Sequence, residues 1–193
     1  MRMIFTVAAA VLLAPAANAA VTVYTDEANF LAALSSYVTE DFADATLVPG
    51  LSFTSDAGVI GSGLFNDRLS PGAASTLFSF TGATAFGGTF DLSPGGFGSG
   101  IQFTLNLSGG GTADGGELRD QNGFYGFIST DVFDSVLMTA GSGPGIETYT
   151  LDNLHIGSGG VVPEPATWAL MIAGFGMVGL AARRRQSAHT VSA

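Results

Sequence analysis

The sequence predicts an all-β fold, a β-sandwich of jelly-roll type, with a closed barrel as the alternative. Short segments from Val38 onward place apolar residues at every second position, the pattern of strands with one buried face. Glycine-rich turns separate these segments, and apolar residues at helical spacing occur only once before the last strand. Fifteen phenylalanines against one tryptophan indicate core filling rather than a stacking surface for sugars.

The expected elements begin with a strand over 21–24. Thr25 is the expected N-cap of one short helix that runs through about Leu34, with Asp26 and Glu27 in its first turn, where the helix dipole favours carboxylates. Phe124–Ile128 is apolar on both faces and is expected to be a central strand. The other expected strands are 51–54, 77–80, 86–92, 101–107, 132–139 and 147–156.

The chain divides into segments by composition. Residues 1–19 are expected to be a signal peptide, 20–156 the β domain and 157–162 a Gly/Ser linker. A sorting segment is expected over 163–185, with a membrane-spanning helix at 166–182 and a cytoplasmic tail at 186–193.

The predicted β domain is strongly acidic. Between Ala20 and Val162 the only basic residues are Arg68 and Arg119, while all acidic residues except Glu164 lie there, 15 of the 16. The resulting net charge of −13 excludes nucleic acid as a partner, because the phosphate backbone would be repelled. The absence of cysteine excludes disulfides and thiolate metal sites.

Calcium is the one metal that the sequence offers ligands for. Asp114 and Glu117, followed by Asp120 and Asn122, concentrate oxygen ligands among glycines. Their spacing departs from an EF-hand, which also ends in a bidentate glutamate. We therefore expect no cofactor, with calcium at these four residues as the alternative to ordinary solvated loop groups.

The residues that enzymes use are sparse in the β domain. His155 is its one histidine, and no Gly-x-Ser-x-Gly nucleophile motif is present. Among 15 acidic residues some pair will lie at a glycosidase-like separation by chance, so paired carboxylates are a weak signal. We expect that the protein is not an enzyme, and a secreted polysaccharide-active enzyme is the alternative.

The N-terminal segment has the three parts of a secretory signal. Arg2 supplies the positive charge, Ile4–Leu13 the apolar stretch, and Ala17 and Ala19 the small residues of the cleavage rule. Cleavage is expected after Ala19, so that Ala20 becomes the first residue of an exported protein.

The C-terminal segment predicts a single membrane crossing. Residues 166–182 contain no charge, and Trp168 lies near their start, where an interfacial aromatic belongs. Arg183, Arg184 and Arg185 follow, and the positive-inside rule places them in the cytoplasm. Just before the apolar stretch, Pro163, Glu164 and Pro165 impose an extended backbone, the conformation in which proteases bind substrates.

These three parts together resemble the PEP-CTERM protein-sorting signal of Gram-negative bacteria, in the variant with tryptophan after the motif. The resemblance implies that an exosortase recognises Pro163, Glu164 and Pro165 and removes the helix. The inner membrane would then be a transient anchor, and the β domain would reach the cell surface or the extracellular space. Proteins with this signal tend to accompany exopolysaccharide production.

We therefore expect an exported surface or matrix protein with a structural or exopolysaccharide-associated role. Two alternatives stay open beside it: the secreted polysaccharide-active enzyme, and a binding domain anchored permanently in the periplasm.

Overall fold

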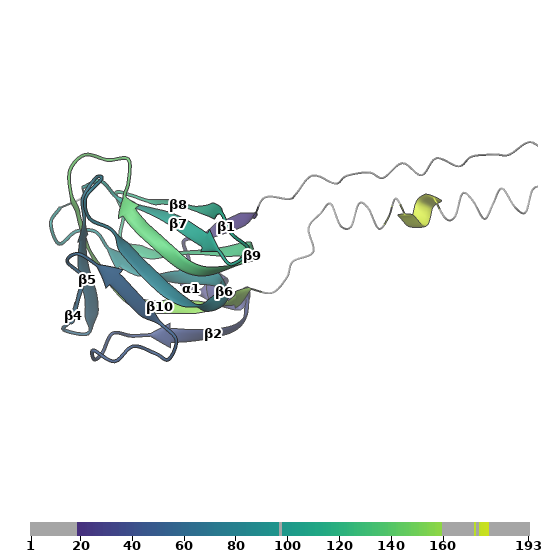
Figure 1. Cartoon of the computed structure of the whole chain (residues 1–193), viewed down its shortest axis with the longest axis horizontal. Coiled ribbons are helices and arrows are strands. Elements are labelled where there is room, and N and C mark those ends of the chain that lie inside the picture. The colour runs from purple at the N-terminus through teal and green to yellow at the C-terminus, as the bar shows by residue number, and fades with distance from the viewer. Residues whose placement is uncertain (1–18, 97, 160–171, 173, 178–193) are drawn as a thin grey trace, which may run out of the picture. The chain divides into compact units, whose positions relative to one another are not determined.

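The computed structural model describes residues 19–96, 98–159, 172 and 174–177, and its β domain is shown in Figure 1. Ten strands form one hydrogen-bonded sheet in which every named pair is antiparallel. The elements are β1 (Val21–Tyr24), α1 (Glu27–Ala32), β2 (Leu34–Glu40), β3 (Ser52–Ser55), β4 (Val59–Gly61), β5 (Leu64–Leu69), β6 (Thr76–Asp91), β7 (Ile101–Leu107), β8 (Thr112–Leu118), β9 (Gly123–Ala140) and β10 (Glu147–Gly159). The all-β prediction is confirmed.

Two long strands give the sheet its two layers. The first part of β9 pairs with β1, its second part pairs with β7, and β6 lies along the other edge of both parts. The two long strands β6 and β9 therefore take part in both layers. One layer also contains β1, β2, β4, β5 and β10, and the other also contains β3, β7 and β8. The sequence predicted separate strands at 77–80 and 86–92, and again at 124–128 and 132–139. The structure joins the first two into β6 and the last two into β9, because the chain bends at register shifts without leaving the sheet.

Phenylalanine side chains fill the space between the layers, as predicted. Phe90 of one layer meets Phe103 of the other with ring centroids 5.5 Å apart. Phe78 and Phe86 lie on either side of the β6 bend at 6.0 Å, and Phe127 is completely buried. All of these residues belong to one core cluster, which lies inside residues 42–156.

The helix α1 packs on the outer face of the first layer. Asp26, rather than the predicted Thr25, is its N-cap, because the Asp26 carboxylate accepts a 2.8 Å hydrogen bond from the Asn29 N–H group. The helix ends at Ala32, so Leu34 starts β2 instead of closing the helix. Phe30 is the buried residue of the helix.

The predicted linker starts too early. Gly157, Ser158 and Gly159 belong to β10 and pair with β2, and the Gly159 N–H group donates a 2.7 Å hydrogen bond to Thr84 Oγ1. Their glycine-rich composition predicts a flexible segment, but their backbone completes the hydrogen-bond ladder between β10 and β2. The compact unit accordingly ends at Gly159.

Strands β2, β4, β5 and β8 were not predicted, and β8 replaces the loop expected around Asp114 and Glu117. The glycines of β8 interrupt the alternation of apolar and polar side chains by which a strand is recognised. One of them is required by the backbone conformation. Gly116 has a φ of +85°, opposite Phe103, where the pairing of β7 and β8 shifts register.

The second unit, Gly160–Ala193, is described only at five positions. Residues 172 and 174–177 are helical. Within the described residues, none of the helices combines the length and apolar character that a membrane crossing requires. Most of the predicted span 166–182 lies outside the described residues.

Candidate functional site

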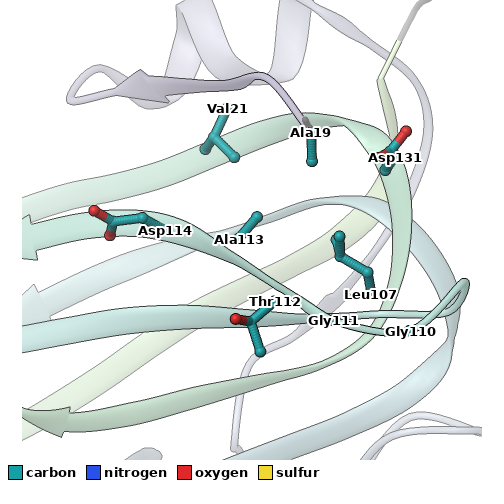
Figure 2. Close-up of a pocket in the computed structure, with 9 residues that line it drawn as sticks. All are labelled: Ala19, Val21, Leu107, Gly110, Gly111, Thr112, Ala113, Asp114 and Asp131. Atoms are coloured by element: carbon teal, nitrogen blue, oxygen red, sulfur yellow. The ribbon is translucent and has the colours of Figure 1, made fainter. Parts of the chain in front are cut away.

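A groove of about 600 Å³ opens at the start of the β domain, beside the predicted signal cleavage site. Figure 2 shows its lining, which comes from the start of β1, the end of β7, the turn that follows it, the start of β8 and the bend of β9. Ala19 lies on its rim, and Asp114 and Asp131 are its charged residues. The residues lining the groove are Ala19, Val21, Leu107, Gly110, Gly111, Thr112, Ala113, Asp114 and Asp131.

The backbone next to Ala19 is tied to the fold. Ala20 N–H donates a 3.0 Å hydrogen bond to Thr130 Oγ1, and the Thr130 N–H group donates one of 2.9 Å to the Ala20 carbonyl. The bond between Ala19 and Ala20 thus lies directly beside folded structure. Ala17, the other predicted cleavage residue, lies outside the described residues.

Two of the four predicted calcium ligands lie on β8. Asp114 Oδ1 accepts hydrogen bonds of 2.8 Å from Gln102 Nε2 and from the Gly116 N–H group. Glu117 Oε1 accepts bonds from the Ser142 N–H group and Oγ, at 2.8 and 2.9 Å. These carboxylates therefore fasten neighbouring segments of the domain.

The other two predicted ligands follow β8 and have different partners. Asp120 pairs with Arg119 Nε at 3.1 Å, and both side chains are exposed. Asn122 Oδ1 accepts a 2.8 Å hydrogen bond from the Leu92 N–H group. In the described part of the chain no cluster of three His, Asp or Glu side chains could hold a metal, and calcium stays a prediction.

His155 lies in a polar contact that the sequence did not indicate. Its Nδ1 is 2.8 Å from Thr39 Oγ1 on β2, and its Nε2 is 2.8 Å from Glu27 Oε1 on α1. The ring is buried and its centroid is 5.6 Å from that of Tyr37. With both nitrogens engaged, His155 joins α1, β2 and β10, and its position on a strand gave no sign of either partner.

Other buried carboxylates bind backbone or hydroxyl groups. Glu40 accepts from the Phe42 and Val48 N–H groups at 2.8 and 2.7 Å. Asp67 accepts from Ser55 Oγ at 2.6 Å and from Thr76 Oγ1. Both therefore stabilise turns and strand ends.

Tyr149 completes the group around Asp67. Its hydroxyl lies 3.0 Å from Thr76 Oγ1, and the side chain is completely buried. Burial raises the pKa of the Tyr149 hydroxyl well above its usual value, and the negative charge of Asp67 acts in the same direction. The phenol therefore serves as a neutral hydrogen-bonding group.

Glu147 at the start of β10 is the most deeply buried of these acids. Its Oε2 accepts hydrogen bonds from the Gly98 and Gly100 N–H groups at 3.0 and 2.7 Å. Its Oε1 is buried without a hydrogen-bond partner among the described residues. The side chain fixes the segment before β7, which sequence composition alone showed only as a glycine-rich turn.

The predicted sorting residues Pro163, Glu164 and Pro165, the interfacial Trp168 and the cluster Arg183, Arg184 and Arg185 all lie outside the described residues. The described domain ends at Gly159, four residues before Pro163.

Three solved structures of carbohydrate-binding modules are similar to the chain at low identity. A CBM29-2 mutant with a tyrosine replaced by alanine has a TM-score of 0.47 at 13% identity, covering 64% of this chain and 94% of its own. A second CBM29-2 mutant, with a lysine replaced by alanine, has a TM-score of 0.47 at 14% identity, covering 68% and 99%. The family 32 module from C. perfringens NanJ in complex with galactose has a TM-score of 0.40 at 11% identity, covering 63% and 98%.

No curated protein matches the chain. The model of one family does, the PEP-CTERM protein-sorting motif, over residues 161–185. The matched segment contains the Pro163 to Pro165 motif, the apolar stretch and the three arginines. These are the three parts in which the sequence resembles the signal. The chain therefore carries a PEP-CTERM protein-sorting motif at its C-terminal end.

Proposed function

We propose that this chain is an exported surface protein that an exosortase recognises at Pro163, Glu164 and Pro165 and separates from its C-terminal helix. The match of residues 161–185 to the sorting motif carries the proposal. In this proposal the helix holds the protein in the inner membrane only until it is processed.

The boundary between the two units supports this assignment. The motif begins two residues after Gly159, and every strand and the entire core cluster lie before it. Cleavage in or near the motif would leave the β domain whole. The function of the C-terminal segment is therefore separable from the function of the β domain.

The proposed spacer is short. Three residues, 160–162, separate Gly159 from Pro163, and the four Cα-to-Cα steps between them span at most about 14 Å. The predicted linker, 157–162, is longer because it includes Gly157–Gly159, which belong to β10. The protease would consequently have to bind its motif close to a folded domain.

For the β domain we propose a structural or exopolysaccharide-associated role without catalysis. Both nitrogens of His155 have partners, and Glu40 and Asp67 hold backbone and hydroxyl groups rather than facing a cleft. The link to exopolysaccharide rests on the sorting signal, because proteins with this signal tend to accompany exopolysaccharide production. A polysaccharide-active enzyme stays the rival proposal.

Intact mass and cell fractionation of the native protein test the sorting proposal. We expect a product that starts at Ala20, ends in the Pro163 region and lies outside the inner membrane. Replacing Pro163, Glu164 and Pro165 with alanine should keep the chain full length in the inner membrane. Pro144→Ala, an exposed loop proline of the β domain, is the matched control and should be processed normally.

The outcomes separate the alternatives. A full-length protein retained in the inner membrane of an exosortase-positive cell would support the permanently anchored periplasmic domain and overturn the sorting proposal. Turnover of a polysaccharide by residues 20–159, abolished by one Asp or Glu substitution, would establish the enzyme instead.

A further inference from the structure

In the part of the chain that the structure describes, five strands pair on one side only, and four of them have features that discourage further pairing. Strands β1, β3 and β4 are only 4, 4 and 3 residues long. Strand β8 is longer, but it carries Asp114 and Glu117 and a register shift. Short length, charge and bulges are the usual means by which proteins protect sheet edges.

Strand β2 has none of this protection over most of its length. Six of its seven residues, all except Ser35, pair with β10, and no other strand pairs with β2 among the described residues. Leu34–Thr39 carries no charge and no proline, and Glu40 is buried under its own hydrogen bonds. Its one register shift lies at Ser35, so the ladder from Ser36 to Glu40 is regular. Figure 1 shows β2 at the outer edge of its layer.

We propose that the free edge of β2 pairs with the β2 edge of a second copy of this chain. The pair would be antiparallel, with a two-fold axis at Tyr37, so that each Tyr37 faces the other. This inference concerns the β domain and does not depend on the sorting proposal.

The sequence of β2 suits pairing with itself. In this register Ser36 faces Val38 of the second copy, while the two Tyr37 rings form an aromatic cross-strand pair. Aromatic cross-strand pairs stabilise antiparallel strands. Tyr37 is 48% exposed and Val38 is 53% exposed, which is high for large apolar side chains on a strand of this domain.

Charge favours this edge for contact between two copies. Two copies of a β domain with a net charge of −13 repel each other. The segment Leu34–Thr39 allows two sheets to meet without carboxylates directly opposite one another, whereas β8 would bring Asp114 and Glu117 of both copies together. Salt should therefore strengthen the association by screening the remaining repulsion.

A small hollow lies beside the same edge. Val38 lines it together with Val48, Leu51, Phe80 and Ile156, and its volume is about 180 Å³. In the proposed register, Ser36 and Val38 of the second copy would lie next to the rim of this hollow. Pairing at β2 would thus cover apolar surface that the single domain leaves open.

Cysteine crosslinking tests the register, because the native chain contains no cysteine. Residues 20–159 contain all the strands that the structure describes and the whole core cluster, so we expect this fragment to fold on its own. Across an antiparallel pair, facing Cα atoms lie about 4.5 to 5.5 Å apart, within the range of a disulfide. Tyr37→Cys should therefore oxidise to a covalent dimer.

Two matched controls use exposed valines. In the proposed register the two copies of residue 38 are diagonal neighbours about 7 to 8 Å apart, so Val38→Cys should form at least tenfold less covalent dimer. Val59→Cys lies on β4, is 59% exposed and should stay monomeric. Circular dichroism and the melting temperature establish that each variant is folded.

Sedimentation of the unmodified fragment gives the second measurement. We expect a monomer–dimer equilibrium that shifts toward dimer between 50 and 500 mM NaCl, and a monomer for folded Val38→Lys. A monomer under all conditions, open-ended aggregates, or equal crosslinking at positions 37 and 59 would each overturn the proposal. The same Tyr37→Cys substitution in the full chain checks the contact in cells.

Discussion

Gly87 of β6 and Gly126 of β9 lie opposite each other, and a Cβ atom on Gly87 would come within 2.8 Å of the Gly126 Cα atom. The Phe30 ring of α1 lies 3.2 Å from the same position. The two glycines therefore provide the space that lets α1 pack on the sheet. Without side chains at these two positions, the two strands can approach each other closely, and Phe30 can pack against Gly87.

Gly126→Ala should destabilise the domain by about 1 to 3 kcal/mol, because the added methyl group overpacks this contact. Chemical denaturation of residues 20–159 measures the change. Gly61→Ala is the control, since a Cβ there meets nothing within 4 Å, and it should change the free energy of unfolding by less than about 0.5 kcal/mol. Equal effects of the two substitutions would contradict the packing role.

His155→Ala should cost about 2 kcal/mol or more, because it removes a buried ring and leaves Thr39 and Glu27 without their common partner. Glu27→Gln should cost less than about 1 kcal/mol, since the Glu27 side chain is partly exposed and solvent weakens the pair. Thermal unfolding of both variants and of the double variant gives the coupling between the two residues. A coupling of zero would show that the 2.8 Å contact contributes nothing.

The stability of the β domain should fall as the pH rises from about 10 to about 12. Burial raises the pKa of Tyr125 to about 12, with Asp114 and Glu117 adding to the effect. Because the unfolded chain loses this proton near pH 10 and the folded chain does not, the stabilisation is complete below about pH 10 and is lost toward about pH 12. Urea unfolding across this range should show a smaller loss for Tyr125→Phe, and an unchanged loss would disprove the assignment.

Removing residues 160–162 should slow exosortase processing severalfold, because Pro163 would then follow Gly159, which is held in β10. Inserting three Gly/Ser residues at the same place should leave processing unchanged or faster. Pulse-chase labelling and membrane fractionation report the rate. Normal processing of the shortened chain would mean that β10 opens at its end or that the protease needs no spacer.

The sequence predicted the regular parts of the fold well. Ile101–Leu107 alternates without a fault and is β7 with the same bounds. The bends of β6 and β9 look like strand ends in the sequence, because hydrophobic alternation stops at a register shift even where the chain stays in the sheet. Strand β8 was missed since its glycines carry no side chains to alternate.

The contacts of the candidate sites were less predictable. Partners such as Glu27 and His155 are 128 residues apart, and local patterns do not contain such pairings. The four predicted calcium ligands are neighbours in sequence, yet they hold segments as distant as Leu92 and Ser142. The sorting motif was accessible from sequence because its parts are contiguous.

The hydrogen bonds between Ala20 and Thr130 also imply an order of events in the proposed export. Strand β1 pairs with Gly126–Ser129, so a chain that crosses the membrane from its N-terminus would complete this ladder only after more than a hundred further residues had crossed. Until then Ala20 would lack the partner that holds it in the fold. The predicted cleavage after Ala19 would therefore come before the sheet is complete.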